Sequence, residues 1–135
     1  MTDFDVTIFH NPKCGASRNT LGLIRAAGYE PRVVEYVKMG WAAPQLHALF
    51  AQMGARPRDV LRTKEALVEE LELLKDAVSD DAIVQAMIDH PILVERPIVT
   101  SPKGAVLARP FEKVIEVLET TPASYTKENG DVVTF

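Results

Sequence analysis

The sequence predicts an α/β fold in which a four-stranded mixed sheet is flanked by helices, with a helical insertion between its two halves. Three observations lead to this prediction. A strand–helix–strand pattern fills residues 6–37, helical spacing dominates residues 40–92, and residues 96–118 hold two strand-like runs followed by a helix. We expect a single domain over residues 1–135, because this length with 47% hydrophobic residues suits one core.

The first half is predicted to be a parallel βαβ unit. Residues 6–9 are rich in β-branched and aromatic side chains, which is typical of a strand. A helix follows and stops at Gly28. Its apolar positions recur at helical spacing: Leu21, Ile24 and Ala27. A second strand is predicted over residues 32–37, and so short a connection through a helix indicates parallel strands.

The predicted insertion, roughly residues 40–92, is helical. One helix begins near Pro44 and ends at Gly54, and a short helical turn follows at residues 57–61. The next helix is indicated by leucines on one face: Leu67, Leu71 and Leu74. Ser79 is the predicted N-cap of a further helix that ends at His90-Pro91.

The last part of the chain is predicted to be a hairpin followed by a helix. Residues 96–100 and 105–108 are strand-like, and Ser101-Pro-Lys-Gly104 between them has the composition of a turn. Pro110 opens the last helix. The polar tail is predicted to have a turn at Asn129-Gly130 and a minor strand at Val132-Val133.

Charge and cysteine content narrow the classes of function. The net charge is −4 and no basic block is present, which argues against nucleic acid as the direct partner. No apolar run is long enough to cross a membrane, and the N-terminus lacks the pattern of a signal peptide. A single cysteine cannot form an internal disulfide, which fits a reducing compartment. We therefore expect a cytoplasmic protein.

Cys14 is the candidate nucleophile, because it lies where a strand turns into a helix. Helix N–H groups and the helix dipole favour an anion there, so the thiol should ionise easily. Ser17 can donate a hydroxyl hydrogen bond to the thiolate, and His10 can support it as a nearby cation. The alternatives are a buried, inert Cys14 and a turn histidine that bonds to the backbone.

Two other cysteine chemistries and a metal site find no support. Cys14-Gly-Ala-Ser17 is not a Cys-x-x-Cys motif, so a two-thiol redox cycle is excluded. Position 20 is threonine, so the Cys-x₅-Arg phosphate loop is absent. One cysteine and three scattered histidines do not form a metal-ligand cluster, and we expect neither a metal nor a bound cofactor.

Three arginines are candidates for binding an oxyanion. Arg96 and Arg109 each precede a proline, which favours extended backbone at strand ends, and Arg62 follows the turn at residues 57–61. Each alone is most simply a solvated surface arginine. If they converge on Cys14, their guanidinium groups match the oxygens of a tetrahedral oxyanion. Sequence spacing does not decide between these two interpretations.

Together these motifs resemble the glutathione- and glutaredoxin-linked arsenate reductase family. The first motif is His10-Asn-Pro-x-Cys14-Gly-x-Ser17-Arg18-Asn-Thr-Leu21. The resemblance continues through Val60-Leu-Arg62, His90-Pro-Ile-Leu-Val-x-Arg96-Pro-Ile-Val99, Arg109-Pro110 and Tyr125-Thr-Lys-Glu-x-Gly130. It covers nearly the whole chain in order, and it is weakest between Thr63 and Ser79.

The resemblance implies a thioredoxin-like fold and arsenate as the substrate. It implies that Cys14 is the nucleophile, that Arg62, Arg96 and Arg109 bind arsenate, and that His10 and Ser17 lower the pKa of the thiol. It also implies a cis Arg96-Pro97 bond, glutathione as co-substrate and glutaredoxin as the partner protein. External thiols are required in any case, since one cysteine cannot end the reaction as an internal disulfide.

Three other functions compete with arsenate reduction. A non-enzymatic regulator of the same fold that binds RNA polymerase needs no oxyanion pocket. A related glutathione-dependent thiol reductase, such as a monothiol glutaredoxin-like protein, needs no set of three arginines. A family member that acts on another oxyanion or thiol adduct also remains open. The joint presence of Cys14, Arg62, Arg96 and Arg109 favours the arsenate reductase.

Overall fold

The computed structural model describes residues 4–135, which form two compact units. The first unit contains residues 4–35 and Arg96–Phe135, and the second contains Tyr36–Glu95. Residues 1–3 belong to the N-terminal stretch in which no signal peptide is predicted, and they lie outside the described residues. Within residues 4–135, no helix has both the length and the apolar character that a membrane span requires.

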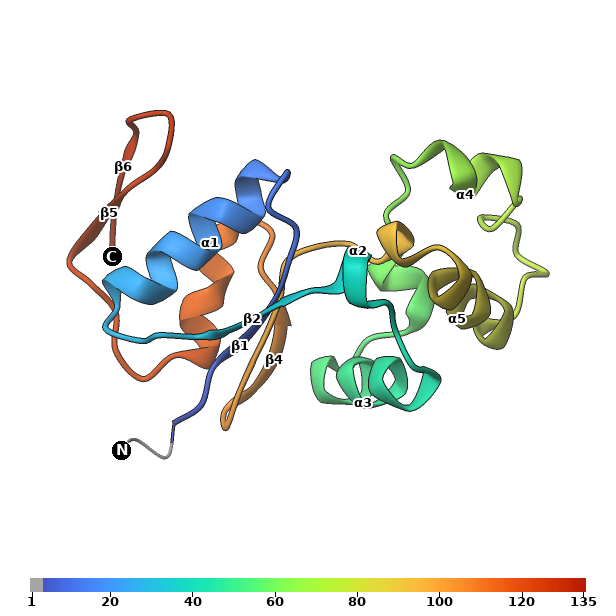
Figure 1. Cartoon of the computed structure of the whole chain (residues 1–135), viewed down its shortest axis with the longest axis horizontal. Helices are drawn as coiled ribbons and strands as arrows, with labels where there is room; N and C mark the ends of the chain where they lie inside the picture. Colours follow the sequence, from blue (N-terminus) through green and yellow to red (C-terminus); the bar gives the residue numbers. More distant parts are fainter. Residues whose placement is uncertain (1–3) are drawn as a thin grey trace. The chain divides into compact units, whose positions relative to one another are not determined.

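The first unit contains a four-stranded mixed sheet, as predicted (Figure 1). Its strands are β1 (Thr7–His10), β2 (Arg32–Glu35), β3 (Ile98–Ser101) and β4 (Gly104–Leu107). The order is β2-β1-β3-β4, with β1 and β2 parallel and the other neighbours antiparallel. The parallel βαβ unit and the β3–β4 hairpin are therefore both confirmed.

The second predicted strand is too long by two residues. The observed strand β2 ends at Glu35, and Tyr36–Met39 form the short helix α2. Tyr36 is almost fully buried, and its hydroxyl donates a hydrogen bond to the carbonyl oxygen of Val94 at 2.8 Å. This residue is therefore part of the core of the second unit, and it leaves the sheet.

One face of the sheet is covered by α1 (Gly15–Ala26) and η3 (Phe111–Val117), which contact each other. The core between them contains residues of the strands, of both helices and of the segments next to them: Val6, Ile8, Leu23, Ile24, Val99, Ala108, Phe111, Val114, Val117 and Leu118. The last helix is a 3₁₀ helix, which has three residues per turn. Its buried residues accordingly recur at every third position, Phe111, Val114 and Val117.

A C-terminal hairpin packs on α1. Its strands are β5 (Ser124–Thr126) and β6 (Val132–Thr134), shown in red in Figure 1. Tyr125 approaches α1 at Gly22 so closely that a Cβ atom at Gly22 would collide with the tyrosine hydroxyl. The ring of Tyr125 also lies 5.9 Å from the ring of Phe111. Only glycine at position 22 permits this packing.

The second unit is helical and covers the predicted insertion. It contains α2, α3 (Ala43–Met53), η1 (Pro57–Val60), α4 (Ala66–Glu70), α5 (Asp80–Asp89) and η2 (Pro91–Leu93). Pro44 lies in the first turn of α3, and Gly54 ends this helix with a φ of 64°. The Ser79 hydroxyl accepts a hydrogen bond from the Ala82 N–H at 3.1 Å, which confirms the predicted N-cap of α5.

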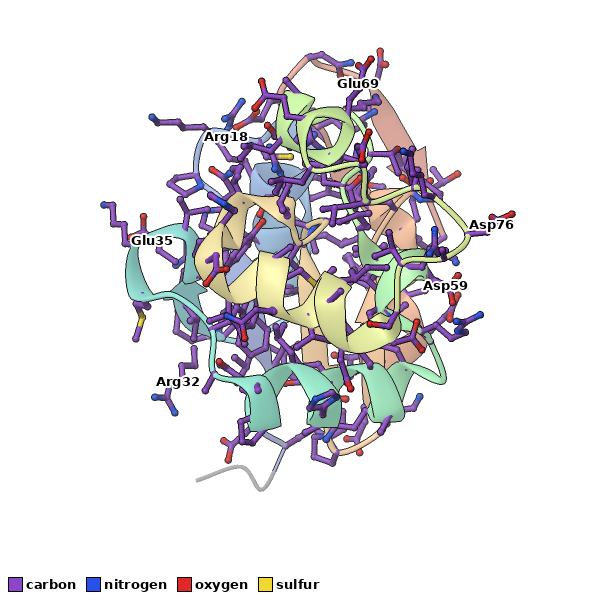
Figure 2. The ribbon with its side chains drawn as sticks, turned by 90° about the vertical axis from the view of Figure 1, so that its right-hand side faces the viewer. Arg18, Arg32, Glu35, Asp59, Glu69 and Asp76 are labelled. Atoms are coloured by element: carbon purple, nitrogen blue, oxygen red, sulfur yellow. The ribbon has the colours of Figure 1, made fainter. Side chains whose placement is uncertain are left out.

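The helix predicted from Leu67, Leu71 and Leu74 is wrong beyond its first turn. α4 ends at Glu70, and the side chains of Leu71 and Leu74 are exposed. The irregular segment that follows is held by Arg58, whose guanidinium donates to four backbone carbonyls that no helix uses: those of Leu73, Leu74, Lys75 and Val78. Charged groups lie on the surface of both units, as Figure 2 shows for Arg32 and Asp76.

Candidate active site

Cys14 lies at the N-cap of α1, where the loop after β1 turns into the helix. Its N–H donates to the carbonyl oxygen of Asn11 at 3.0 Å, and its own carbonyl accepts from the Arg18 N–H at 3.0 Å. The side-chain oxygen of Asn11 accepts from the Lys13 N–H at 3.0 Å and closes the turn. Cys14 therefore lies at the start of the helix, as the sequence predicts, and its half-buried sulfur is close to the backbone N–H of Ser17.

The surroundings of Cys14 stabilise the thiolate. Burial alone would raise the pKa of the thiol, but the backbone N–H of Ser17 and the guanidinium groups of Arg96 and Arg109 outweigh it. The net effect is a pKa below the ordinary value of a cysteine. Hydrogen-bond donors and two cations next to a half-buried sulfur are the environment of a reactive cysteine.

Arg96 and Arg109 meet at Cys14. Nη1 of Arg109 lies 3.9 Å from Cys14 Sγ and donates to the carbonyl oxygen of Arg96 at 3.0 Å. Arg96 is 7% exposed, so its charge is held inside the protein. The Arg96-Pro97 bond is cis, as the resemblance implies, and Arg109-Pro110 is a second cis bond that the sequence analysis does not predict.

Arg62 belongs to the second unit, where two carboxylates bind it. Its Nη1 lies 2.7 Å from Glu95 Oε1, and its Nε lies 3.1 Å from Glu65 Oε1. Burial alone would lower the pKa of this guanidinium, but the hydrogen bonds and charges of Glu95 and Glu65 raise it. Its backbone N–H donates to the carbonyl of Leu93 at 2.7 Å. The convergence of Arg62 with the other two arginines stays a prediction.

His10 and Ser17 form a buried hydrogen-bonded pair next to the Cys14 turn. Nδ1 of His10 lies 2.6 Å from Oγ of Ser17, which also accepts the Asn11 N–H at 3.1 Å. Ser17 therefore supports the thiol through its backbone N–H, and its hydroxyl is bonded to His10. Burial lowers the pKa of His10, which disfavours the charged form of the ring, and support of the thiolate by His10 stays a prediction.

Sequence reasoning missed two residues that shape this site. Asn11 provides the carbonyl that accepts from Cys14, and its side chain closes the turn. Arg18 donates from Nη1 to the carbonyl of Pro12 at 2.8 Å and from Nε to the carboxylate of Glu128 at 3.0 Å. The Asn-Pro pair is a turn signal that points to the first role. The second depends on a contact across 110 positions, which no local pattern reveals.

The geometry supports nucleophilic attack on an anion. The Cys14 sulfur, the backbone N–H of Ser17 and two guanidinium groups lie together in the first unit. Guanidinium groups bind tetrahedral oxyanions, and the same positive charge keeps the sulfur ionised. Among residues 4–135, no group of three or more His, Cys, Asp or Glu side chains is arranged to hold a metal ion.

Comparison with known proteins shows the family of this chain. The model of the ArsC family matches residues 9–117. The chain belongs to the ArsC family. An arsenate reductase of Synechocystis sp. is 50% identical over 134 residues, which cover 98% of this chain and 93% of that protein. An arsenate reductase of Escherichia coli is 44% identical over 130 residues, which cover 96% of this chain and 92% of that protein.

The fold of this ArsC protein is also that of its relatives. A solved structure of an arsenate reductase from Vibrio cholerae superposes with a TM-score of 0.83 at 42% identity, covering 87% of this chain and 100% of the other. These findings confirm the resemblance that the sequence motifs carry and the thioredoxin-like fold that it implies.

Proposed function

We propose that this ArsC protein is an arsenate reductase in which Cys14 is the nucleophile. The observation that carries the proposal is the contact of Arg109 with the Cys14 sulfur and with the Arg96 carbonyl, at 3.9 Å and 3.0 Å. This contact places positive charge beside the Cys14 sulfur, the atom that must approach the arsenate anion. The names of its relatives, arsenate reductases at 44–50% identity, supply the substrate.

The first step is attack of the Cys14 thiolate on the arsenic of arsenate. A Cys14 S–As(V) bond forms, and one arsenate oxygen leaves as water after it takes up protons. Arg96 and Arg109 bind the remaining oxygens and reduce the repulsion between two anions. We include Arg62 as a third arsenate-binding residue on the basis of the resemblance. His10 and Ser17 hold the loop in the geometry that directs the sulfur outward.

External thiols complete the cycle, because the reduction takes two electrons and the chain has one cysteine. Glutathione displaces a second oxygen as water, which gives Cys14–S–As(V)–S–glutathione. A glutaredoxin thiolate then attacks the glutathione sulfur. A mixed disulfide of glutaredoxin and glutathione forms, and the electron pair of the broken S–As bond reduces arsenic to As(III). Hydrolysis of the Cys14 S–As(III) bond releases arsenite. The cycle uses no bound cofactor.

Two of the alternatives, the protein-binding regulator and the glutathione-dependent thiol reductase, fit the site less well. A regulator that binds RNA polymerase has no use for a low-pKa thiol between two guanidinium groups. A monothiol glutaredoxin-like reductase needs the thiol but not Arg96 and Arg109 beside it. Both alternatives leave the most unusual feature of the site, two arginines at one sulfur, without a purpose.

The choice of electron donor tests the proposed cycle. We expect arsenate-dependent oxidation of NADPH with glutathione, glutathione reductase and glutaredoxin. Thioredoxin with thioredoxin reductase should not sustain turnover, because no internal disulfide forms for it to reduce. Efficient turnover with thioredoxin alone would show that the proposed electron route is wrong, while arsenate reduction itself would stand.

A further inference from the structure

A cavity of about 460 Å³ lies beside the first turn of α1, within the first unit. Three segments far apart in the sequence line it, and they contribute Gly15, Ala16, Pro110, Phe111, Lys127 and Glu128. Its volume falls within the range of roughly 300–1,000 Å³ that is typical of small-molecule sites. We propose that this cavity binds glutathione, with Lys127 binding one of its carboxylates. The proposal rests on the proposed function and assigns a place to its thiol substrate.

Two residues that line the cavity directly follow residues of the candidate active site. Gly15 follows Cys14 in the chain, and Pro110 follows Arg109, whose Nη1 is 3.9 Å from the sulfur. A thiol that attacks arsenic bound to Cys14 must be held close to that sulfur, because an oriented reactant reacts far faster than a free one. This cavity is suitably placed to hold the rest of the glutathione molecule while its sulfur reaches the arsenic.

The cavity wall is fixed before any ligand binds. The turn that carries Lys127 and Glu128 connects β5 to β6, and two contacts fasten it to α1. The carboxylate of Glu128 accepts from Arg18 Nε, with both oxygens at 3.0 Å, and the Glu128 N–H donates to Asn19 Oδ1 at 3.1 Å. A preformed wall reduces the conformational entropy that the protein would otherwise lose when a ligand binds.

The charges in the cavity match those of glutathione, which has two carboxylates and one ammonium group. The Lys127 ammonium lies 5.6 Å from the centre of the Phe111 ring, and within residues 4–135 no carboxylate forms an ion pair with it. Glu128 is already paired with Arg18, whereas Glu112, which also lines the cavity, can accept the ammonium of the ligand. Pro110, Phe111 and Ala16 offer an apolar surface to the peptide backbone.

The test is the KM for glutathione in the coupled assay at saturating arsenate. Lys127→Ala should raise this KM about three- to tenfold, the effect of one charged contact at a partly exposed site. Lys127→Glu should raise it further, and the KM for arsenate should stay unchanged in both. Lys113→Ala is the matched control, since it removes the same charge from an exposed position of η3 outside the cavity. Equal KM values for glutathione in all variants would overturn the proposal.

A binding experiment separates this proposal from the proposed function. S-methylglutathione has no free thiol, so its binding does not depend on arsenate chemistry. In NMR titrations of the wild-type protein it should shift the amide signals of Gly15, Ala16 and Lys127, and Lys127→Ala should weaken the binding. Shifts confined to other residues would overturn the cavity assignment even if arsenate is reduced. Binding at the cavity by a protein that reduces no arsenate would instead overturn the proposed function.

Discussion

Nη1 of Arg109 lies 3.9 Å from Sγ of Cys14, and the same nitrogen donates to the carbonyl oxygen of Arg96 at 3.0 Å. The backbone of Arg96 thus orients the side chain of Arg109. Both guanidinium groups lower the pKa of the thiol, so the ionisation of Cys14 depends on both arginines. Disturbing either arginine should change both the ionisation of Cys14 and the binding of substrate.

The Cys14 thiol should titrate below the free value of about 8.5, which ultraviolet absorbance of the thiolate will measure. A lowered pKa means that the reactive form persists as the pH falls, and activity should decline only below that pKa. Arg109→Ala should raise the pKa because it removes one of the cations. Arg32→Ala, at an exposed position, is the control. A pKa at or above the free value would remove the case for an activated thiol.

Alanine at Arg62, Arg96 or Arg109 should lower kcat/KM for arsenate on the order of tenfold to a hundredfold, the value of one charged hydrogen bond. Lysine at the same positions should restore only part of the lost kcat/KM, because a point charge does not reproduce the two-pronged contact of a guanidinium group. The effect on stability should be much smaller than the effect on turnover.

Arg32→Ala and Arg56→Ala are the controls for this series. The Arg56 side chain is 69% exposed in its ion pair with Asp80, so its loss should be nearly silent. If all three alanine variants at Arg62, Arg96 and Arg109 keep wild-type efficiency, the arginines do not bind the substrate. A protein-binding role would then be the better explanation of the fold.

Ser17→Ala should destabilise the protein by about 1–3 kcal/mol, because it leaves His10 and the Asn11 N–H without their buried partner. The pH dependence follows from His10, whose pKa is lowered by burial. Below about pH 6.5 the unfolded chain takes up a proton that the folded His10 resists, so stability should fall as the pH drops through that value. Above it this contribution is fully present. Denaturant unfolding at several pH values measures both effects.

His10→Gln provides the control for the pH effect. Glutamine does not titrate, so the part of the stability slope due to this position should disappear. If the slope between pH 7 and pH 5 is the same in the variant and the wild type, His10 is not the group that is held neutral. The contribution would then have to come from other groups.

Gly22→Ala should destabilise the protein by about 1–3 kcal/mol, the usual cost of overpacking. In most helices this change is favourable, since glycine costs about 0.5–1 kcal/mol relative to alanine. Here the new Cβ would collide with the Tyr125 hydroxyl and come within 2.9 Å of its Cζ. In the double variant with Tyr125→Ala, adding Gly22→Ala should no longer cost stability. Equal costs in both backgrounds would contradict the packing of the hairpin on α1.

Local patterns in the sequence were sufficient to predict most of the fold and part of the site. The turn at Asn11-Pro12, the stop at Gly54 and the cap at Ser79 each act within a few residues, so their signals are visible in the chain. The position of Cys14 at a helix start follows from the same kind of signal. The pairing of Arg96 with Arg109 needed the motif resemblance, because it depends on how the β3–β4 hairpin places its two ends.

The errors come from contacts between distant residues. Leu71 and Leu74 fit a helical period, but Arg58 binds the carbonyls of their segment and stabilises an irregular path. The hydroxyl of Ser17 also contacts His10, seven positions away, a buried pair that local patterns do not reveal. In both cases a side chain from elsewhere in the chain satisfies polar groups that local patterns do not link to it.

The role of Cys14 as the nucleophile is tested most directly by comparing the wild type with Cys14→Ser. The measurement is arsenate-dependent NADPH oxidation in the presence of glutathione, glutathione reductase and glutaredoxin. Circular dichroism of both proteins controls for folding, and the half-buried thiol at a helix start should tolerate a serine. We expect steady turnover by the wild type and none above background by the variant. Substantial arsenate reduction by folded Cys14→Ser would contradict the role of Cys14 as the nucleophile.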